Sequence, residues 1–120
     1  MEDNRQADFN IMSVYEVLVH LGVTANYRGF QQCAYAVCLC VQNPDRLSMV
    51  TKWLYPDVAK RYHTTAGAVD RNIRSVVARA WKQNPAFLRE LAGCPVPKMP
   101  TASQFFTILV FHFLLGPSAA

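Results

Sequence analysis

The sequence predicts an all-α fold, a compact bundle of about six helices that contains a helix-turn-helix. Apolar residues recur at helical spacing in segments separated by Gly, Pro and Asn, and residues 52–82 hold two such segments in close succession. Hydrophobic residues make up 52% of the chain and charged ones 17%, a globular composition rather than a disordered one. Because 120 residues bury one moderate core, we expect a single domain over 1–120.

In the first half of the chain, glycine and proline separate the predicted helices. Residues 1–8 are polar and contain no signal peptide, so we expect an N-terminal extension there. A first helix is predicted over 9–21, with Gly22 ending it, and a second, largely buried helix over 29–42. Asn43-Pro44 breaks this helix, and Asp45 or Ser48 is expected to cap the next one, through Leu54.

The second half begins with the helix-turn-helix. Its first helix is predicted to start at Tyr55-Pro56, and its second helix to run to Trp81 or Lys82. A short helix over 86–92 is closed by Gly93, and prolines keep 94–100 from being helical. The last helix, 104–115, is started by Thr101 or Ser103.

The turn between the two helices of the motif has a residue for each special position. His63 is expected in the left-handed region, which His tolerates better than most residues, and Thr65 is a good N-cap. Because Val69 and Ile73 point inward, a polar patch points out from the first two turns, formed by Asp70, Arg71 and Arg74. The DNA-binding form of the motif presents this part of its second helix to base edges in the major groove.

Charge is distributed unevenly around a net value of +4. Residues 51–90 are basic, whereas the first 20 residues are comparatively acidic. A basic region centred on the helix-turn-helix is typical of proteins that contact phosphates, although clustered charge alone usually marks a solvated face.

Residues 51–81, TKWLYPDVAKRYHTTAGAVDRNIRSVVARAW, strongly resemble the C-terminal effector domain of the sporulation response regulator family, stage 0 sporulation protein A. The resemblance continues more weakly over most of the chain, at LGV (21–23), at Tyr27-Arg28-Gly29-Phe30 and at Pro100-Thr101-x-Ser103-x-Phe105. It implies an all-helical bacterial transcription regulator that binds a short promoter element in double-stranded DNA, usually as tandem copies.

The resemblance also implies which residues contact DNA. The base-contacting set falls on Asp70, Arg71 and Arg74. Either arginine fits guanine O6 and N7, while Asp70 accepts from a cytosine amino group or only orients an arginine. Phosphate contacts are expected from Lys60, Thr64, Thr65, Ser75 and Arg79. The alternative is a solvated face on which Asp70 and Arg74 pair at i, i+4.

The last helix is apolar on nearly every side, and 104–115 is shorter than the roughly 20 residues that a membrane span needs. It is predicted either to be enclosed by the bundle or to offer one face to a partner, as a homodimer or a heterodimer. The second possibility gives the competing function, a protein-interaction module that sequesters a related regulator.

The residues give little support for a metal site, disulfide bonds or catalysis. Cys33, Cys38, Cys40 and Cys94 lack zinc-site spacing, and no secretion signal favours disulfides. We therefore expect the three thiols of helix 29–42 to be core residues, in a cytoplasmic, nucleoid-associated protein. Phosphate-binding loops and catalytic motifs are absent, which predicts no enzyme activity and no cofactor. The family's receiver domain finds no counterpart in the sequence, so we expect these residues to be the effector part alone.

Overall fold

The computed structural model describes residues 10–116, so the extension expected over 1–8 lies outside the described residues. Within that range the chain is all-helical and contains no strand, which confirms the predicted fold class. The α-helices are α2 (Ile11–His20), α3 (Arg28–Gln42), α4 (Tyr55–Arg61), α5 (Ala66–Gln83), α6 (Pro85–Ala92) and α7 (Ala102–Leu115).

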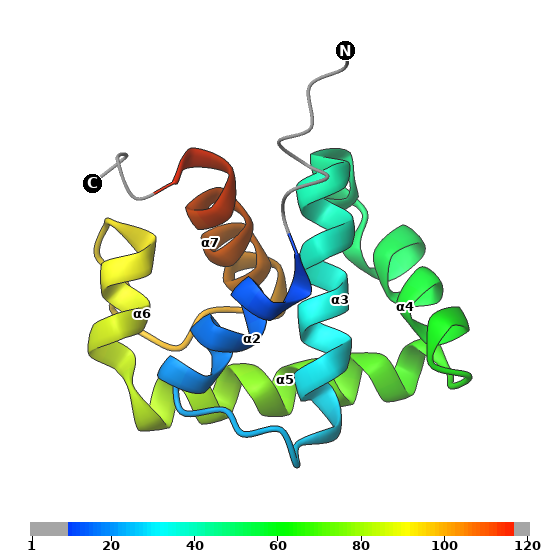
Figure 1. The fold of residues 1–120 in the computed structure, drawn as a ribbon, viewed down its shortest axis with the longest axis horizontal. Helices are drawn as coiled ribbons and strands as arrows, with labels where there is room; N and C mark the ends of the chain where they lie inside the picture. Colours follow the sequence, from blue (N-terminus) through cyan, green and yellow to red (C-terminus); the bar gives the residue numbers. More distant parts are fainter. Residues whose placement is uncertain (1–9, 117–120) are drawn as a thin grey trace.

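Helix α3 passes through the middle of the bundle and α5 lies across its base (Figure 1). In that view α4 stands on one side of α3, and α6 and α7 stand on the other. Helix α3 packs against α2, α5 and α7, and buried side chains from α2 to α7 form one hydrophobic cluster. The predicted central role of 29–42 is therefore confirmed.

Most helix ends follow the expected signals. Gly22 has φ +93° just after α2, and Gly93 has φ +67° at the end of α6, where a residue with a Cβ is strained. Thr101 caps α7 in a capping box, in which its Oγ accepts from the Gln104 backbone N–H and the Gln104 side chain accepts from the Thr101 N–H.

The segment between α3 and α4 differs from the expectation. A 3-10 helix, η1 (Pro44–Ser48), is followed by a π-helical turn, η2 (Val50–Leu54), which continues directly into α4. The expected cap by Asp45 or Ser48 is wrong: Asn43 accepts the Asp45 backbone N–H at 3.2 Å, and η2 has no side-chain cap. Asn43 takes this role because its backbone is already extended before Pro44.

Helix α7 is packed into the bundle along most of its length and exposed at its end. Phe105, Phe106, Leu109 and Val110 are fully buried, so most of its apolar surface belongs to the core. Its last turns nevertheless expose three large apolar side chains, Phe111, Leu114 and Leu115. Among the described residues, every helix falls short of the length and apolar character needed to cross a membrane.

The cysteines are free thiols in different environments. Cys33 and Cys40 are buried on α3, Cys38 is half-buried, and Cys94 is exposed in the proline-rich connector. Burial raises the pKa of Cys38 to about 11 and that of Cys40 to about 12, the latter although Arg46 acts in the opposite direction. The described residues contain no His, Cys, Asp and Glu cluster suited to a metal ion.

Alkylation with iodoacetamide at pH 8 is expected to modify Cys94 at least about tenfold faster than the three thiols of α3, because the thiolate is the reactive form. Peptide mass spectrometry at successive times measures each rate. In urea all four cysteines should react at similar rates. A Cys40 that reacts as fast as Cys94 in the folded protein would contradict the burial of α3.

Candidate nucleic-acid interface

The helix-turn-helix consists of α4, the turn Tyr62–Thr65 and α5. His63 is the described non-glycine residue with positive φ, at +56°, as the sequence predicted. The turn is closed by the Thr64 backbone N–H, which donates to Ala59 O at 3.0 Å. Thr65 then caps α5, since its Oγ1 accepts from the Ala68 N–H at 3.1 Å. These local bonds fix the angle at which α5 leaves the turn.

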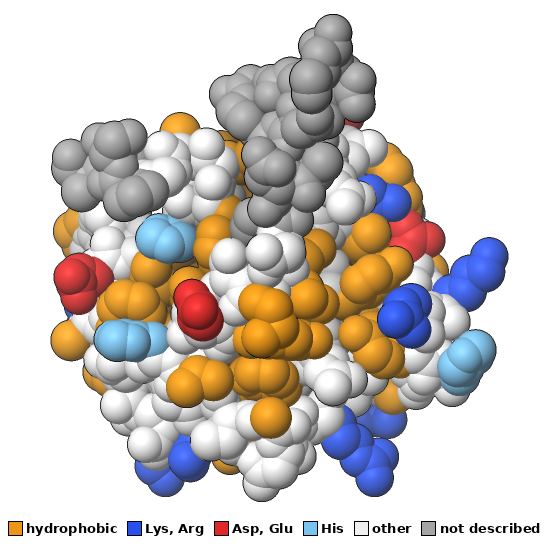
Figure 2. Space-filling view, viewed as in Figure 1, with side chains coloured by type: hydrophobic (Ala, Val, Ile, Leu, Met, Phe, Trp, Pro, Cys, Tyr) orange, Lys and Arg blue, Asp and Glu red, His pale blue; other side chains and the backbone are white. Residues whose placement is uncertain are grey.

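The inward face of α5 is apolar, formed by Val69, Ile73, Val76, Val77 and Ala80. The opposite face is exposed and carries Gly67, Arg71, Ser75 and Lys82. The Arg71 guanidinium forms no hydrogen bond or ion pair with another described residue. Lys and Arg side chains project along the lower edge in Figure 2, where Figure 1 places α5. The outer face of α5 is therefore exposed and carries two basic side chains, Arg71 and Lys82.

Asp70 and Arg74 lie on one flank of this face. The Arg74 Nη2 donates to Asp70 Oδ2 at 2.8 Å, so the i, i+4 pair that the sequence offered as an alternative is formed in the free protein. The Arg74 side chain is 72% exposed and that of Asp70 is 32% exposed. An exposed pair of this kind contributes only about 0.3–0.5 kcal/mol, so Arg74 remains available to another acceptor.

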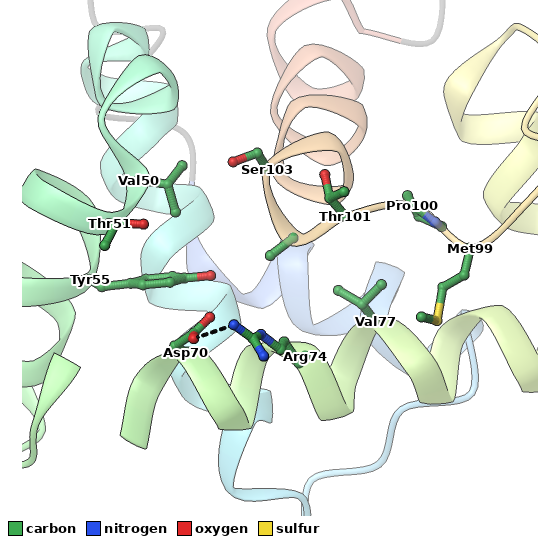
Figure 3. A pocket seen from close by; sticks show the side chains of 11 residues that line it. Val50, Thr51, Tyr55, Asp70, Arg74, Val77, Met99, Pro100, Thr101 and Ser103 are labelled. Carbon is green, nitrogen blue, oxygen red and sulfur yellow. Dashed lines mark hydrogen bonds and ion pairs between the residues drawn. The ribbon is translucent and has the colours of Figure 1, made fainter. Parts of the chain in front are cut away.

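The Asp70–Arg74 pair borders a groove of about 470 Å³ between α5, the start of α4 and the start of α7 (Figure 3). Apolar walls come from Val50, Val77, Met99 and Pro100. Polar groups converge on the same space: the groove is also lined by Thr51, Tyr55, Asp70, Arg74, Thr101 and Ser103.

The residues expected at phosphates are distributed around the motif. Lys60 is exposed near the end of α4, and Thr64 and Thr65 lie in the turn at the N-terminus of α5. Ser75 is exposed on the outer face, with its Oγ donating to Arg71 O at 3.2 Å. These four side chains thus belong to the helix-turn-helix itself, at the end of α4, in the turn and on the outer face of α5.

Arg79 is placed differently, because it also holds the fold together. Its Nε donates to Gly22 O at 3.1 Å, and its guanidinium stacks over the Tyr27 ring at 5.6 Å. Asn72, one turn from Ser75, donates to Gln32 Oε1 at 3.0 Å and so joins α5 to α3. The second flank of α5 is therefore attached to the bundle through polar side chains.

Sequence reasoning missed the positions of three residues around the helix-turn-helix. Arg28 lines a hollow of about 330 Å³ that also contains Asn72 and Ser75. Arg61 is exposed and stacks over Tyr62 at 5.3 Å. Tyr55 forms part of the groove beside Asp70. The basic character of Arg28 and Arg61 was visible in the sequence, but the position of Arg28 beside α5 depends on how distant helices pack.

An all-α bundle that presents a basic, exposed second helix of a helix-turn-helix is a DNA-binding domain of the helix-turn-helix class. Comparison with protein families agrees and is more specific. The family model described as "Sporulation initiation factor Spo0A C terminal" matches residues 14–113, and the chain belongs to this family. The family is a DNA-binding effector domain of transcription regulators in sporulation.

Proposed function

We propose that this protein is a sequence-specific double-stranded DNA-binding transcription regulator that inserts the N-terminal half of α5 into the major groove. The observation that carries the proposal is the Arg71 guanidinium, exposed and unpaired among the described residues, next to the weakly paired Arg74 on the same turns of α5. A cytoplasmic, nucleoid-associated location follows from this function.

The base-reading chemistry follows from side-chain geometry. Arg71 is free to donate two hydrogen bonds to guanine O6 and N7 without giving up a bond within the protein. Arg74 reaches a second guanine once it leaves Asp70, at the small cost of an exposed pair. Asp70 then accepts from a cytosine amino group or orients an arginine beside it, and the shorter Asp side chain favours the second role.

Phosphate contacts are assigned to the groups around this helix. The N-terminus of α5, with the Thr64 and Thr65 hydroxyls, is suited to a phosphate because its backbone N–H groups and dipole attract anions. Lys60 and Ser75 extend the phosphate contact on either side. Arg79 contacts a phosphate through its Nη groups, because only its Nε donates to Gly22 O. Such contacts fix register and make affinity fall with salt.

Fluorescence anisotropy on a duplex with two copies of the family's promoter element and on a scrambled duplex tests the proposal. The wild-type protein is expected to prefer the element by at least about tenfold, and Arg71→Ala/Arg74→Ala to lose that preference, since each bidentate contact contributes about 1–3 kcal/mol. Lys98→Ala removes a charge from the exposed connector and serves as the control.

The logarithm of affinity for either duplex should fall linearly with the logarithm of salt concentration, with a slope of about −0.9 for each phosphate neutralised. Lys60→Ala should reduce this slope and weaken both duplexes alike. Equal binding of the two duplexes by the wild-type protein, or no binding at low salt, would exclude the proposed function.

A second candidate function rests on the exposed Phe111, Leu114 and Leu115 at the end of α7. On this proposal α7 mediates a homodimer or a heterodimer with a related regulator. Analytical ultracentrifugation with Leu115→Ser distinguishes the two functions, because a DNA-reading monomer would keep both its mass and its preference for the element. Tandem binding would in either case raise the affinity through effective concentration.

A further inference from the structure

The Tyr55 hydroxyl is an unusual buried group. Tyr55 is 3% exposed, and its Oη has no hydrogen-bond partner among the described residues. The ring is fixed at the start of α4 and meets the Phe106 ring edge-on, with centroids 6.3 Å apart. A buried hydroxyl without a partner destabilises the folded state, which suggests that the partner is acquired in another state of the protein.

The hydroxyl points toward the groove that Asp70 and Arg74 border, as Figure 3 shows. Burial raises the pKa of Tyr55, and the Asp70 carboxylate and Cys33 raise it further, whereas Arg74 lowers it. Tyr55 is therefore protonated at neutral pH and is a hydrogen-bond donor. The two charged groups of the pair are also its electrostatic neighbours.

DNA binding as proposed above changes the surroundings of Asp70. When Arg74 donates to a base, the Asp70 carboxylate loses the bond that it has at 2.8 Å in the free protein. Asp70 is only 32% exposed, so water replaces that bond incompletely. The donor that already lines the same groove without a partner is the Tyr55 hydroxyl.

We propose that Tyr55 is a positioning residue for base recognition: its hydroxyl donates to the Asp70 carboxylate when Arg74 leaves Asp70 for a guanine. One Asp70 oxygen then accepts from Tyr55, and the other remains to accept from a base. This exchange satisfies a buried donor only in the sequence-specific complex. The inference rests on the proposed function, because it requires Arg74 to contact DNA.

The proposal predicts opposite effects of Tyr55→Phe on folding and on recognition. The free protein should be as stable as wild type or more stable, since the substitution removes an unpaired buried hydroxyl and keeps the ring. Affinity for the promoter element should fall by about 3- to 10-fold, the range of one hydrogen bond. Affinity for the scrambled duplex should stay unchanged, because Arg74 does not leave Asp70 there.

The experiment measures thermal unfolding and anisotropy on both duplexes for wild type, Tyr55→Phe, Asp70→Asn and the double variant. Coupling is expected: with Asn at position 70, Tyr55→Phe should cause little further loss of affinity for the element. Tyr15→Phe is the matched control, because Tyr15 lies on α2, stacked on Phe30 at 5.0 Å, away from the groove.

Two results would overturn the inference. In the first, Tyr55→Phe binds the element like wild type while Arg71→Ala/Arg74→Ala abolishes the preference, in which case the proposed function stands and Tyr55 has no part in it. Alternatively, Tyr55→Phe lowers the unfolding temperature and weakens both duplexes equally, which identifies a purely structural residue. Failure of the function itself is recognised separately, because the wild-type protein then shows no preference.

Discussion

Phe106→Ala is expected to lower the free energy of unfolding by about 3–5 kcal/mol. Phe106 is fully buried on α7, and its ring contacts Tyr55 at the start of the helix-turn-helix. Truncation removes the apolar contacts of the ring and leaves a cavity that fixed helices do not close. Because a domain is stabilised by only about 5–15 kcal/mol in total, this is a large fraction. Urea denaturation followed by circular dichroism measures the change.

Phe111→Ala is the matched control, since it makes the same substitution on the same helix at a side chain that is 44% exposed. Its effect should stay below about 1 kcal/mol. Similar losses at both positions would contradict the burial pattern of α7. A loss at Phe111 that grows with protein concentration would instead indicate an intermolecular contact through the end of the helix.

The features that the sequence predicted correctly depend on residues close to one another in the chain. The His63 turn, the Thr65 cap and the start of α7 at Thr101, one of the two residues that the sequence offered, each involve partners within a few positions, so the residue types largely determine them. The apolar face of α5 follows in the same way from helical spacing. Fold class and the helix-turn-helix could therefore be predicted before the structure was known.

The features that it missed depend on packing between distant segments. Tyr55 acquires its place beside Asp70 only when α4, α5 and α7 enclose one groove. Arg79 was expected at a phosphate, and nothing in its neighbourhood along the chain reveals its bond to Gly22. Near Pro44 three residues, Asn43, Asp45 and Ser48, are all suited to cap a helix. Asn43 is the cap of η1 because it precedes the proline and its backbone is extended.

Gly29→Ala is expected to destabilise the protein by about 1–3 kcal/mol and to weaken DNA binding. A Cβ on Gly29 would lie 2.4 Å from Asn72 O and 2.7 Å from Val76 Cγ2, both on α5. A backbone carbonyl is not able to move aside as a flexible side chain does, so α3 and α5 must separate. That movement also strains the Asn72–Gln32 bond of 3.0 Å, which holds α5 in place.

Gly67→Ala provides the comparison that isolates this contact. Gly29 and Gly67 are the second residues of α3 and α5, so alanine makes the same change in helix propensity at both. At Gly67 the nearest atoms to a new Cβ are 3.9 and 4.0 Å away, and we expect a gain of about 0.4–1 kcal/mol. Urea denaturation of both variants measures the difference. If both variants are more stable than wild type, α3 and α5 do not approach as closely as described. If Gly67→Ala is more stable and Gly29→Ala less stable, the loss of stability is assigned to the contact that positions the recognition helix.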